Sequence, residues 1–138
     1  IGTAQSALEE AQKYMNDREQ FGKKIAEFQG MQFKIADMVT ELIAARTMTR
    51  LAASKIDSND SEATVYSAMA KRFATDVGFN VCNEALQIFG GYGYIQEYPL
   101  ERHVRDVRVH QILEGTNEIM KMIIGRRMIM EDAASIIQ

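Results

Sequence analysis

Apolar residues recur three or four positions apart along most of the chain, and no segment shows the strict alternation of a strand. This pattern predicts a first helix over residues 2–18 and a second over residues 28–56, which would be about 40 Å long at ~1.5 Å per residue. The polar and aromatic segment 19–23 separates them. The predicted apolar faces are Ala4, Ala7, Leu8, Ala11, Tyr14 and Met15 in the first helix, and Met31, Ile35, Met38, Leu42, Ala45, Met48 and Ala52, supported by Val39 and Ile43, in the second.

The second half of the chain continues the helical pattern. A third helix is predicted over residues 61–89, apolar on so broad a face that both of its sides should be covered. The polar segment 57–60 offers caps for it. A short helix follows, with Pro99 in its first turn, and a last long helix should run from Thr116 to about residue 132. Short connections favour antiparallel neighbours, so the fold predicted is all-α, a four-helix up-down bundle with an additional short helix.

Composition narrows the possible functions. The 138 residues amount to one domain. The net charge of −3 gives no electrostatic basis for a nucleic-acid or membrane-surface partner, and no apolar run approaches the ~20 residues of a membrane span. Cys82 is the only cysteine, so no internal disulfide can form. His103 and His110 lie seven residues apart without a cysteine pair, which does not indicate a metal site.

The segment 110–119 contains the strongest candidate for chemistry. Glu114 follows two apolar residues and precedes Gly115 and Thr116, a natural N-cap. A carboxylate at this place can simply complement the helix dipole. If Ile112 and Leu113 partly desolvate it, its pKa would rise toward the working pH and it could act as a general base. Gly115 would let a substrate approach the backbone.

Two further segments have both a structural and a functional interpretation, and a third is interpreted as structural. Arg18 and Phe21 could complement a helix end and anchor the core, or could hold a phosphate and a purine ring by charge and stacking. The glycine-rich segment 87–94 could cap the third helix or admit an extended ligand. The charged residues Arg102, Arg105, Asp106 and Arg108 are interpreted as ion pairs between helices or subunits.

The order of these motifs resembles the C-terminal helical domain of the acyl-CoA dehydrogenase family, over essentially the whole chain. The segments that carry the resemblance are Arg18-Glu19-Gln20-Phe21-Gly22, then Gln87-Ile88-Phe89-Gly90-Gly91-Tyr92-Gly93-Tyr94, then Arg105-Asp106, then Gln111-Ile112-Leu113-Glu114-Gly115-Thr116-Asn117-Glu118-Ile119. In local sequence, residues 69–76 and 109–115 resemble most the isobutyryl-CoA, or short-branched-chain, branch of the family.

The resemblance implies a chemistry and a role for each motif. Family members bind FAD and oxidise an acyl-CoA thioester to the trans-2-enoyl-CoA, and electrons then pass to electron-transfer flavoprotein. Glu114 matches the catalytic base that removes the α-proton, and Gly115 would lie against the acyl-thioester. Thr116 and Glu118 match positions near the FAD of the subunit that carries the base. The residues matching those that hold the FAD of a neighbouring subunit are Arg18, Phe21, Gln29, Gln87, Gly90 and Gly91.

The resemblance also sets expectations for the whole protein. The chain opens directly in helical sequence without Met, and we expect it to be the C-terminal domain of a longer dehydrogenase whose N-terminal helical and middle β domains are absent. Such a domain should form a homodimer or homotetramer and should be inactive alone. It would be cytoplasmic in a bacterium and in the mitochondrial matrix of a eukaryote. Two alternatives stay open: an acyl-CoA oxidase-type flavoenzyme and a non-catalytic helical oligomerisation module.

Overall fold

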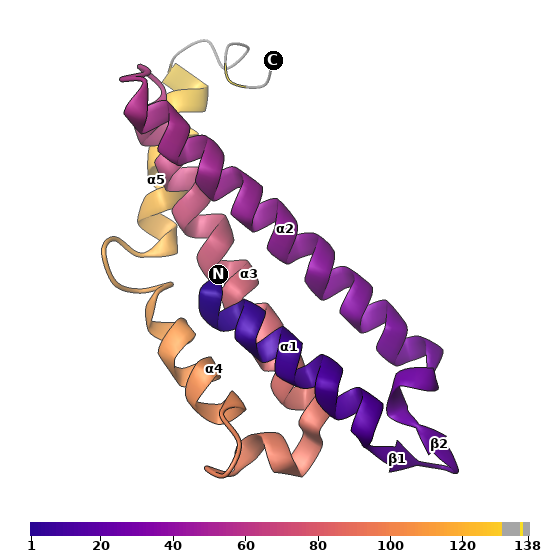
Figure 1. Cartoon of the computed structure of the whole chain (residues 1–138). Helices are drawn as coiled ribbons and strands as arrows, with labels where there is room; N and C mark the ends of the chain where they lie inside the picture. Colours follow the sequence, from indigo (N-terminus) through magenta and orange to yellow (C-terminus); the bar gives the residue numbers. More distant parts are fainter. Residues whose placement is uncertain (131–135, 137–138) are drawn as a thin grey trace.

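The computed structural model describes residues 1–130 and 136, and it confirms the predicted all-α fold. Its helices are α1 (Gly2–Asp17), α2 (Gln29–Asp57), α3 (Ala63–Phe89), α4 (Leu100–Val109) and α5 (Asn117–Met130). Figure 1 shows α2 and α3 side by side in opposite directions, with α1 alongside the lower half of α3. The short α4 and then α5 follow one another back along α3, so together they take the fourth position of the bundle (Figure 1).

Helix α3 is the centre of the bundle, because it packs against each of the other four helices. A helix covered on several sides has to be apolar around much of its circumference. This requirement explains the broad apolar face in the sequence. Its buried residues are Val65, Ala68, Ala70, Val77, Gly78, Val81, Cys82, Ala85, Ile88 and Phe89.

Helix α1 buries the face that its sequence predicts. Ala4, Ala7 and Ala11 are completely buried, and Met15 is 4% exposed. Alanine adds only one methyl group to the backbone, so a row of alanines lets two helices approach closely. This close contact with α3 holds the far end of α1, and the residues after it, near the end of α3.

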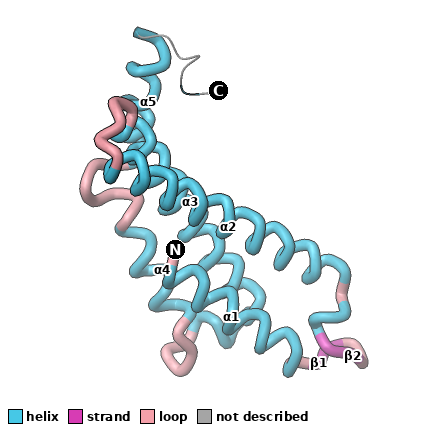
Figure 2. Tube along the Cα trace, turned by 45° about the horizontal axis from the view of Figure 1, so that its top comes forward, coloured by secondary structure: helices cyan, strands magenta, loops and turns pink. Residues whose placement is uncertain are grey.

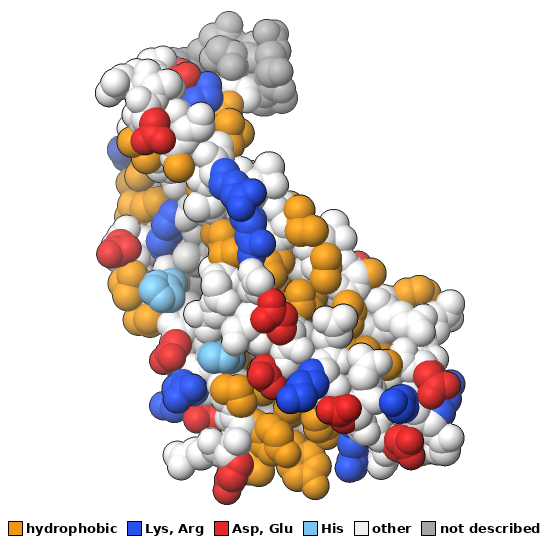
Figure 3. Space-filling view, in the orientation of Figure 1, with side chains coloured by type: hydrophobic (Ala, Val, Ile, Leu, Met, Phe, Trp, Pro, Cys, Tyr) orange, Lys and Arg blue, Asp and Glu red, His pale blue; other side chains and the backbone are white. Residues whose placement is uncertain are grey.

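The prediction for α2 is right in its central stripe and wrong in its supporting residues. Met38, Leu42, Ala45 and Ala52 are buried. Val39 and Ile43, however, are 37% and 58% exposed. Each lies one position beyond a buried residue, and one position turns the side chain by about 100° around the helix. Figure 3 shows the resulting hydrophobic side chains on the surface along α2.

The segment between α1 and α2 forms a small hairpin that the sequence pattern did not predict. Strands β1 (Glu19–Gln20) and β2 (Lys23–Lys24) pair antiparallel, and a 3₁₀ turn over Ile25–Glu27 follows. Strands of two residues are too short to show alternation in a sequence. Phe21 and Gly22 at the tip both have positive φ, 54° and 80°, which is the signature of a type I′ hairpin turn.

The α2–α3 and α3–α4 connections lie at opposite ends of the bundle, whereas the loop between α4 and α5 lies at its side (Figure 2). The predicted cap from segment 57–60 is wrong: α3 starts at Ala63, its N-cap is Glu62, and no side chain caps it. The Asp60 carboxylate instead accepts the Glu62 N–H at 2.8 Å and so fixes the turn just before the helix. After α3 the chain makes a 3₁₀ turn over Gly90–Tyr94. The predicted end of the last helix at residue 132 lies outside the described residues. None of the described helices has the length and apolarity needed to cross a bilayer.

Candidate active site

Glu114 lies at a sharp corner in the loop between α4 and α5. Its φ is +56° and that of Gly115 is +89°, so two consecutive residues adopt the left-handed conformation. Glycine adopts it freely, but glutamate does so at a cost of about 1 kcal/mol or more. The Glu114 side chain is exposed, so the fold of this chain gains no core packing from it. Strain at an exposed residue is typical of a functional site.

A polar cluster on α3 holds this corner. The Lys71 ammonium donates hydrogen bonds to the Gly115 carbonyl at 2.6 Å and to the Asn117 Oδ1 at 2.8 Å. The Asn117 Nδ2 donates to Asp76 Oδ1 at 2.7 Å and to Thr75 Oγ1 at 2.9 Å. Gln111, on the other side of the corner, donates to the same Asp76 oxygen at 2.7 Å. Both sides of the Glu114 corner are therefore fixed to one helix.

Thr116 and Glu118 begin α5 immediately after this corner. The Thr116 hydroxyl accepts the Ile119 N–H at 3.4 Å, which confirms the predicted cap. Hydrogen bonds from the Glu118 amide and from the Thr116 hydroxyl lower the pKa of the Glu118 carboxyl. Free N–H groups at a helix start favour a negative charge. The Glu118 carboxyl is therefore ionised. It lies two residues after Thr116 and four residues after Glu114 in the sequence.

The glycine-rich turn and Arg18 come together at the other end of the molecule. Gly90, Gly91 and Arg18 all line an open groove of about 500 Å³. The Arg18 guanidinium lies 5.8 Å from the centre of the Tyr92 ring. Gly90 ends α3 with a φ of +60°, so the capping interpretation of this glycine is correct. Because Gly90 has no side chain, its backbone is also accessible in the groove that Arg18 lines.

Phe21 is not the core anchor that one interpretation of its motif predicted. Its side chain is 92% exposed, and its ring meets the Phe28 ring edge-on at 6.2 Å between centroids. A bulky residue with positive φ is a conformational outlier. Gln29, at the start of α2, and Gln87, near the end of α3, are also exposed. These three side chains are available to a ligand or partner outside this chain.

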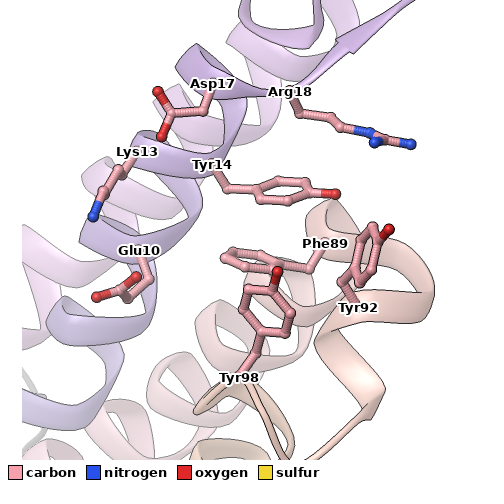
Figure 4. A pocket seen from close by; sticks show the side chains of 8 residues that line it. All are labelled: Glu10, Lys13, Tyr14, Asp17, Arg18, Phe89, Tyr92 and Tyr98. Carbon is pink, nitrogen blue, oxygen red and sulfur yellow. The ribbon is translucent and has the colours of Figure 1, made fainter.

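The sequence did not indicate the aromatic pocket beside Arg18, which Figure 4 shows. It has a volume of about 440 Å³, and Tyr14, Tyr92 and Tyr98 contribute to its walls. The Tyr14 and Phe89 rings are stacked with centroids 4.1 Å apart. Burial raises the pKa of Tyr14. Tyrosines on three different segments form this wall, so only the folded chain could bring them together.

The predicted site residues therefore form two separate groups. Glu114, Gly115, Thr116 and Glu118 lie where the α4–α5 loop meets residues 71–76 of α3. Arg18, Gly90 and Gly91 lie beyond the last residue of α3. Some 14–19 residues of helix separate these places, which is about 20–30 Å. Figure 1 shows the two connections at different heights of the bundle.

Among residues 1–130 and 136, the charged residues of α4 form no ion pair with another helix, so that half of the prediction is wrong, whereas ion pairs between subunits stay a prediction. Arg105 pairs with Glu101 one turn earlier in the same helix, at 2.8 Å. The Arg108 guanidinium instead lies 6.0 Å from the centre of the Phe79 ring of α3. In the part of the chain that the structure describes, no three His, Cys, Asp or Glu residues are grouped so as to hold a metal ion.

The family model for the acyl-CoA dehydrogenase C-terminal domain matches residues 1–129. The chain belongs to the acyl-CoA dehydrogenase family. It is 49% identical over 132 residues to the mitochondrial isobutyryl-CoA dehydrogenase of Dictyostelium discoideum, which covers 96% of this chain and 32% of the relative. It is 50% identical over 125 residues to a subunit of the caffeyl-CoA reductase–Etf complex of Acetobacterium woodii, covering 91% of this chain and 33% of that subunit.

A solved acyl-CoA dehydrogenase has the same fold. The butyryl-CoA dehydrogenase of Megasphaera elsdenii matches with a TM-score of 0.89 at 46% identity, over 92% of this chain and 33% of that one. The chain thus spans about a third of the length of the relatives it matches. The resemblance to the family, and to its isobutyryl-CoA branch, is confirmed.

Proposed function

We propose that this chain is the C-terminal domain of an FAD-dependent dehydrogenase that converts a short or branched-chain acyl-CoA to its trans-2-enoyl-CoA. The single observation that carries the proposal is the Glu114 corner, an exposed carboxylate held in a strained conformation by residues of α3. The similarity to isobutyryl-CoA and butyryl-CoA dehydrogenases supports the acyl-CoA class of substrate. Of the possible acyl groups, isobutyryl has the most support.

In this proposal Glu114 removes the α-proton of the thioester. Such a proton is weakly acidic, so the carboxylate has to act in a site from which water is excluded. FAD, when bound, accepts the hydride that leaves the β-carbon. Gly115 would lie against the acyl-thioester, since it presents backbone without a side chain. Thr116 and Glu118 would lie near the same flavin.

The groove between Arg18 and the glycine turn suits part of a dinucleotide. A guanidinium and bare backbone at Gly90 and Gly91 are complementary to a pyrophosphate, and the apolar remainder of the groove suits a ring system. Arg18, Phe21, Gln29, Gln87, Gly90 and Gly91 would hold FAD that serves the Glu114 of a second subunit. The distance of about 20–30 Å along α3 between the two groups supports a site that two subunits share.

We further propose that the whole protein is a homodimer or homotetramer and passes electrons to electron-transfer flavoprotein. The exposed hydrophobic side chains on α2, Phe33, Val39, Ile43 and Leu51, support a contact with another domain or a second copy. The relative from a reductase–Etf complex supports the electron partner. Light scattering should find an oligomer; a monomer would contradict this part of the proposal.

The central test is Glu114→Gln in the full-length protein, assayed with isobutyryl-, 2-methylbutyryl- and butyryl-CoA and a dye acceptor. The variant should keep its oligomeric state and bound FAD but lose most of its activity, because an amide cannot accept the proton. Glu97→Gln, at an exposed carboxylate in the turn before α4, is the matched control and should retain activity. Full activity of Glu114→Gln would refute the assignment of the base and favour the oligomerisation module.

Two further assays separate the alternatives. Peroxide release during turnover of the full-length protein would indicate an acyl-CoA oxidase. The 138-residue chain mixed with FAD, an acyl-CoA and dye should not reduce the dye, because it spans only about a third of the length of its relatives. Clear dye reduction would contradict the expectation that this domain is inactive alone.

A further inference from the structure

The Glu114 corner needs an external contact to hold its shape. Glu114 and Gly115 are both left-handed, and Glu114 is exposed, so packing of its own side chain does not stabilise this conformation. Gly115 has the greatest freedom of rotation in the loop because it has no Cβ. Any rotation about its backbone would redirect the Glu114 carboxylate relative to α5. The contact that restrains Gly115 therefore controls where the carboxylate points.

Lys71 of α3 supplies that contact. Its ammonium group lies 2.6 Å from the Gly115 carbonyl oxygen and 2.8 Å from the Asn117 side-chain oxygen. A charged donor forms shorter and stronger hydrogen bonds to these oxygens than a neutral one. Lys71 thus bridges two acceptors that lie one and three residues after Glu114. It comes from a position 43 residues earlier in the chain than Glu114, on the central helix of the bundle.

The second acceptor of Lys71 is itself immobilised. Asn117 is only 4% exposed and is the one buried polar residue among residues 1–130 and 136. Its amide is bonded to Thr75 and Asp76, and its backbone N–H donates to the Gln111 carbonyl at 3.0 Å. Lys71 and Thr75 are spaced i and i+4, so they lie on one face of α3, and Asp76 beside Thr75 reaches the same Asn117 amide. The ammonium group therefore has a fixed position from which to hold Gly115.

We propose that Lys71 is a positioning residue for the base: it holds the Gly115 carbonyl against Asn117 and so fixes the corner from which Glu114 reaches the substrate. The inference rests on the proposed dehydrogenase function and deepens it. Lys71 itself contacts no reacting atom in this scheme. Its effect is on the geometry of proton removal, for which a displacement of about 1 Å costs about 100-fold in rate.

The test uses the full-length flavoprotein with Lys71→Met, Lys71→Arg and the control Lys121→Met. Lys121 is an exposed lysine on α5, so its replacement removes the same charge near the loop. Lys71→Met should lower kcat by about 10- to 100-fold with little change in KM and in bound FAD. The isotope effect with α-deuterated substrate should rise, because proton removal becomes slower than the other steps. Lys71→Arg should recover part of kcat, and Lys121→Met should match the wild type.

Hydrogen exchange of the backbone amides provides a readout that does not depend on activity. Exchange of the peptide that contains residues 111–117 should become faster in Lys71→Met and stay unchanged in Lys121→Met. If Lys71→Met does not fold, Lys71→Gln provides the test, because glutamine retains a donor on a shorter side chain. It should show a smaller fall in kcat and a smaller increase in the exchange of residues 111–117.

The outcomes separate this inference from the proposed function. An active Glu114→Gln enzyme would refute the proposed function. An inactive Glu114→Gln enzyme together with normal kcat, isotope effect and loop exchange in Lys71→Met would refute only the role of Lys71. A fall in activity that follows loss of FAD, with an unchanged isotope effect, would show that Lys71 is structural and would also overturn the inference.

Discussion

Strained and exposed residues mark the two halves of the candidate site. Only Phe21, Asn59 and Glu114 among the described non-glycine residues have positive φ. Asn59 lies in the turn between α2 and α3, and asparagine tolerates this conformation well. Phe21 and Glu114 do not belong to the residue types that tolerate it, and both are exposed. Both were candidates from the motifs alone, so the strain is independent support for their selection.

Phe21→Asn should make the domain more stable and the flavoprotein worse at retaining FAD. Asn-Gly is the preferred pair for a type I′ turn, so the change should relieve strain of about 1 kcal/mol. It should also remove the aromatic surface proposed to contact the cofactor. Urea unfolding measures the first effect, and FAD affinity of the full-length protein measures the second.

The control for this trade-off is Phe33→Asn, at a residue of α2 that is 60% exposed. This change should not stabilise the domain, because asparagine is a poorer residue in a helix and no strained turn is relieved. A Phe21→Asn protein that loses stability would contradict the strain argument. One that keeps normal FAD affinity would remove Phe21 from the cofactor site.

At the scale of elements, α4 depends on a single completely buried anchor. Leu100, at its first position, has no exposed surface and is one of the largest fully buried side chains among the described residues. Helix α4 leads directly into the Glu114 loop. The placement of this anchor therefore affects both the stability of the core and the start of the Glu114 loop.

Leu100→Ala should lower the free energy of unfolding by about 2–5 kcal/mol, through lost burial and the cavity left behind. Chemical denaturation measures the change. Val109→Ala, at the other end of α4 where the side chain is 45% exposed, is the control and should cost about 0.5 kcal/mol or less. Equal effects at the two positions would mean that α4 is not held by Leu100.

The turn between α2 and α3 should make the domain sensitive to acid. The Lys55 ammonium, 2.7 Å from Asp60, and then the Glu62 amide lower the pKa of the Asp60 carboxyl. A hydrogen bond from Arg127 likewise lowers the pKa of Glu62. A carboxyl with a lowered pKa stabilises the folded state at every pH above its ordinary pKa. That stabilisation is lost as the pH falls through the lowered value.

The difference in unfolding free energy between the wild type and Asp60→Asn should accordingly be constant from pH 7 to about pH 5 and should shrink below about pH 4. Thermal unfolding over this pH series measures it. Asp37→Asn, on the exposed side of α2 and away from the turn, serves as the control. A difference between wild type and Asp60→Asn that grows toward low pH would contradict the assigned direction.

At the scale of the whole molecule, the two groups of site residues predict complementation between subunits. One full-length protein with Glu114→Gln and another with Arg18→Ala should each be nearly inactive. In a mixed dimer, one site receives both defects, while the other combines an intact Glu114 with an intact Arg18. Random mixing makes about half of the dimers mixed, so about a quarter of the wild-type activity should return.

The measurement is the acyl-CoA oxidation rate after the two variants are unfolded and refolded together, with separately refolded samples mixed afterwards as the control. Recovery should appear only in the jointly refolded sample. If both groups served the same subunit, each site in a mixed dimer would contain one defect and no activity would return. That result would refute the shared site but not the role of Glu114.

The sequence by itself determined the helices, the family and the candidate residues. Helical spacing reflects which face is buried, and this local property located α1, α2 and α3 within one or two residues. It also identified the Glu114, Arg18 and glycine-rich motifs. It could not separate Val39 and Ile43 from the buried stripe of α2, because burial depends on which neighbours are present.

Only the tertiary structure decided which residues meet. The hydrogen bonds from Lys71 to Gly115 and Asn117 join positions more than 40 residues apart, and nothing in local spacing specifies such a pair. The polar residues of α3 at positions 71, 75 and 76 are visible in the sequence, but the same helix contains other polar residues, such as Arg72 and Asn80, so nothing singles them out. Their role depends on a loop that folds back onto α3. The physical reason is that a sequence pattern reflects whether each side chain is more stable buried or exposed, whereas the packing of the helices determines which other residues it contacts.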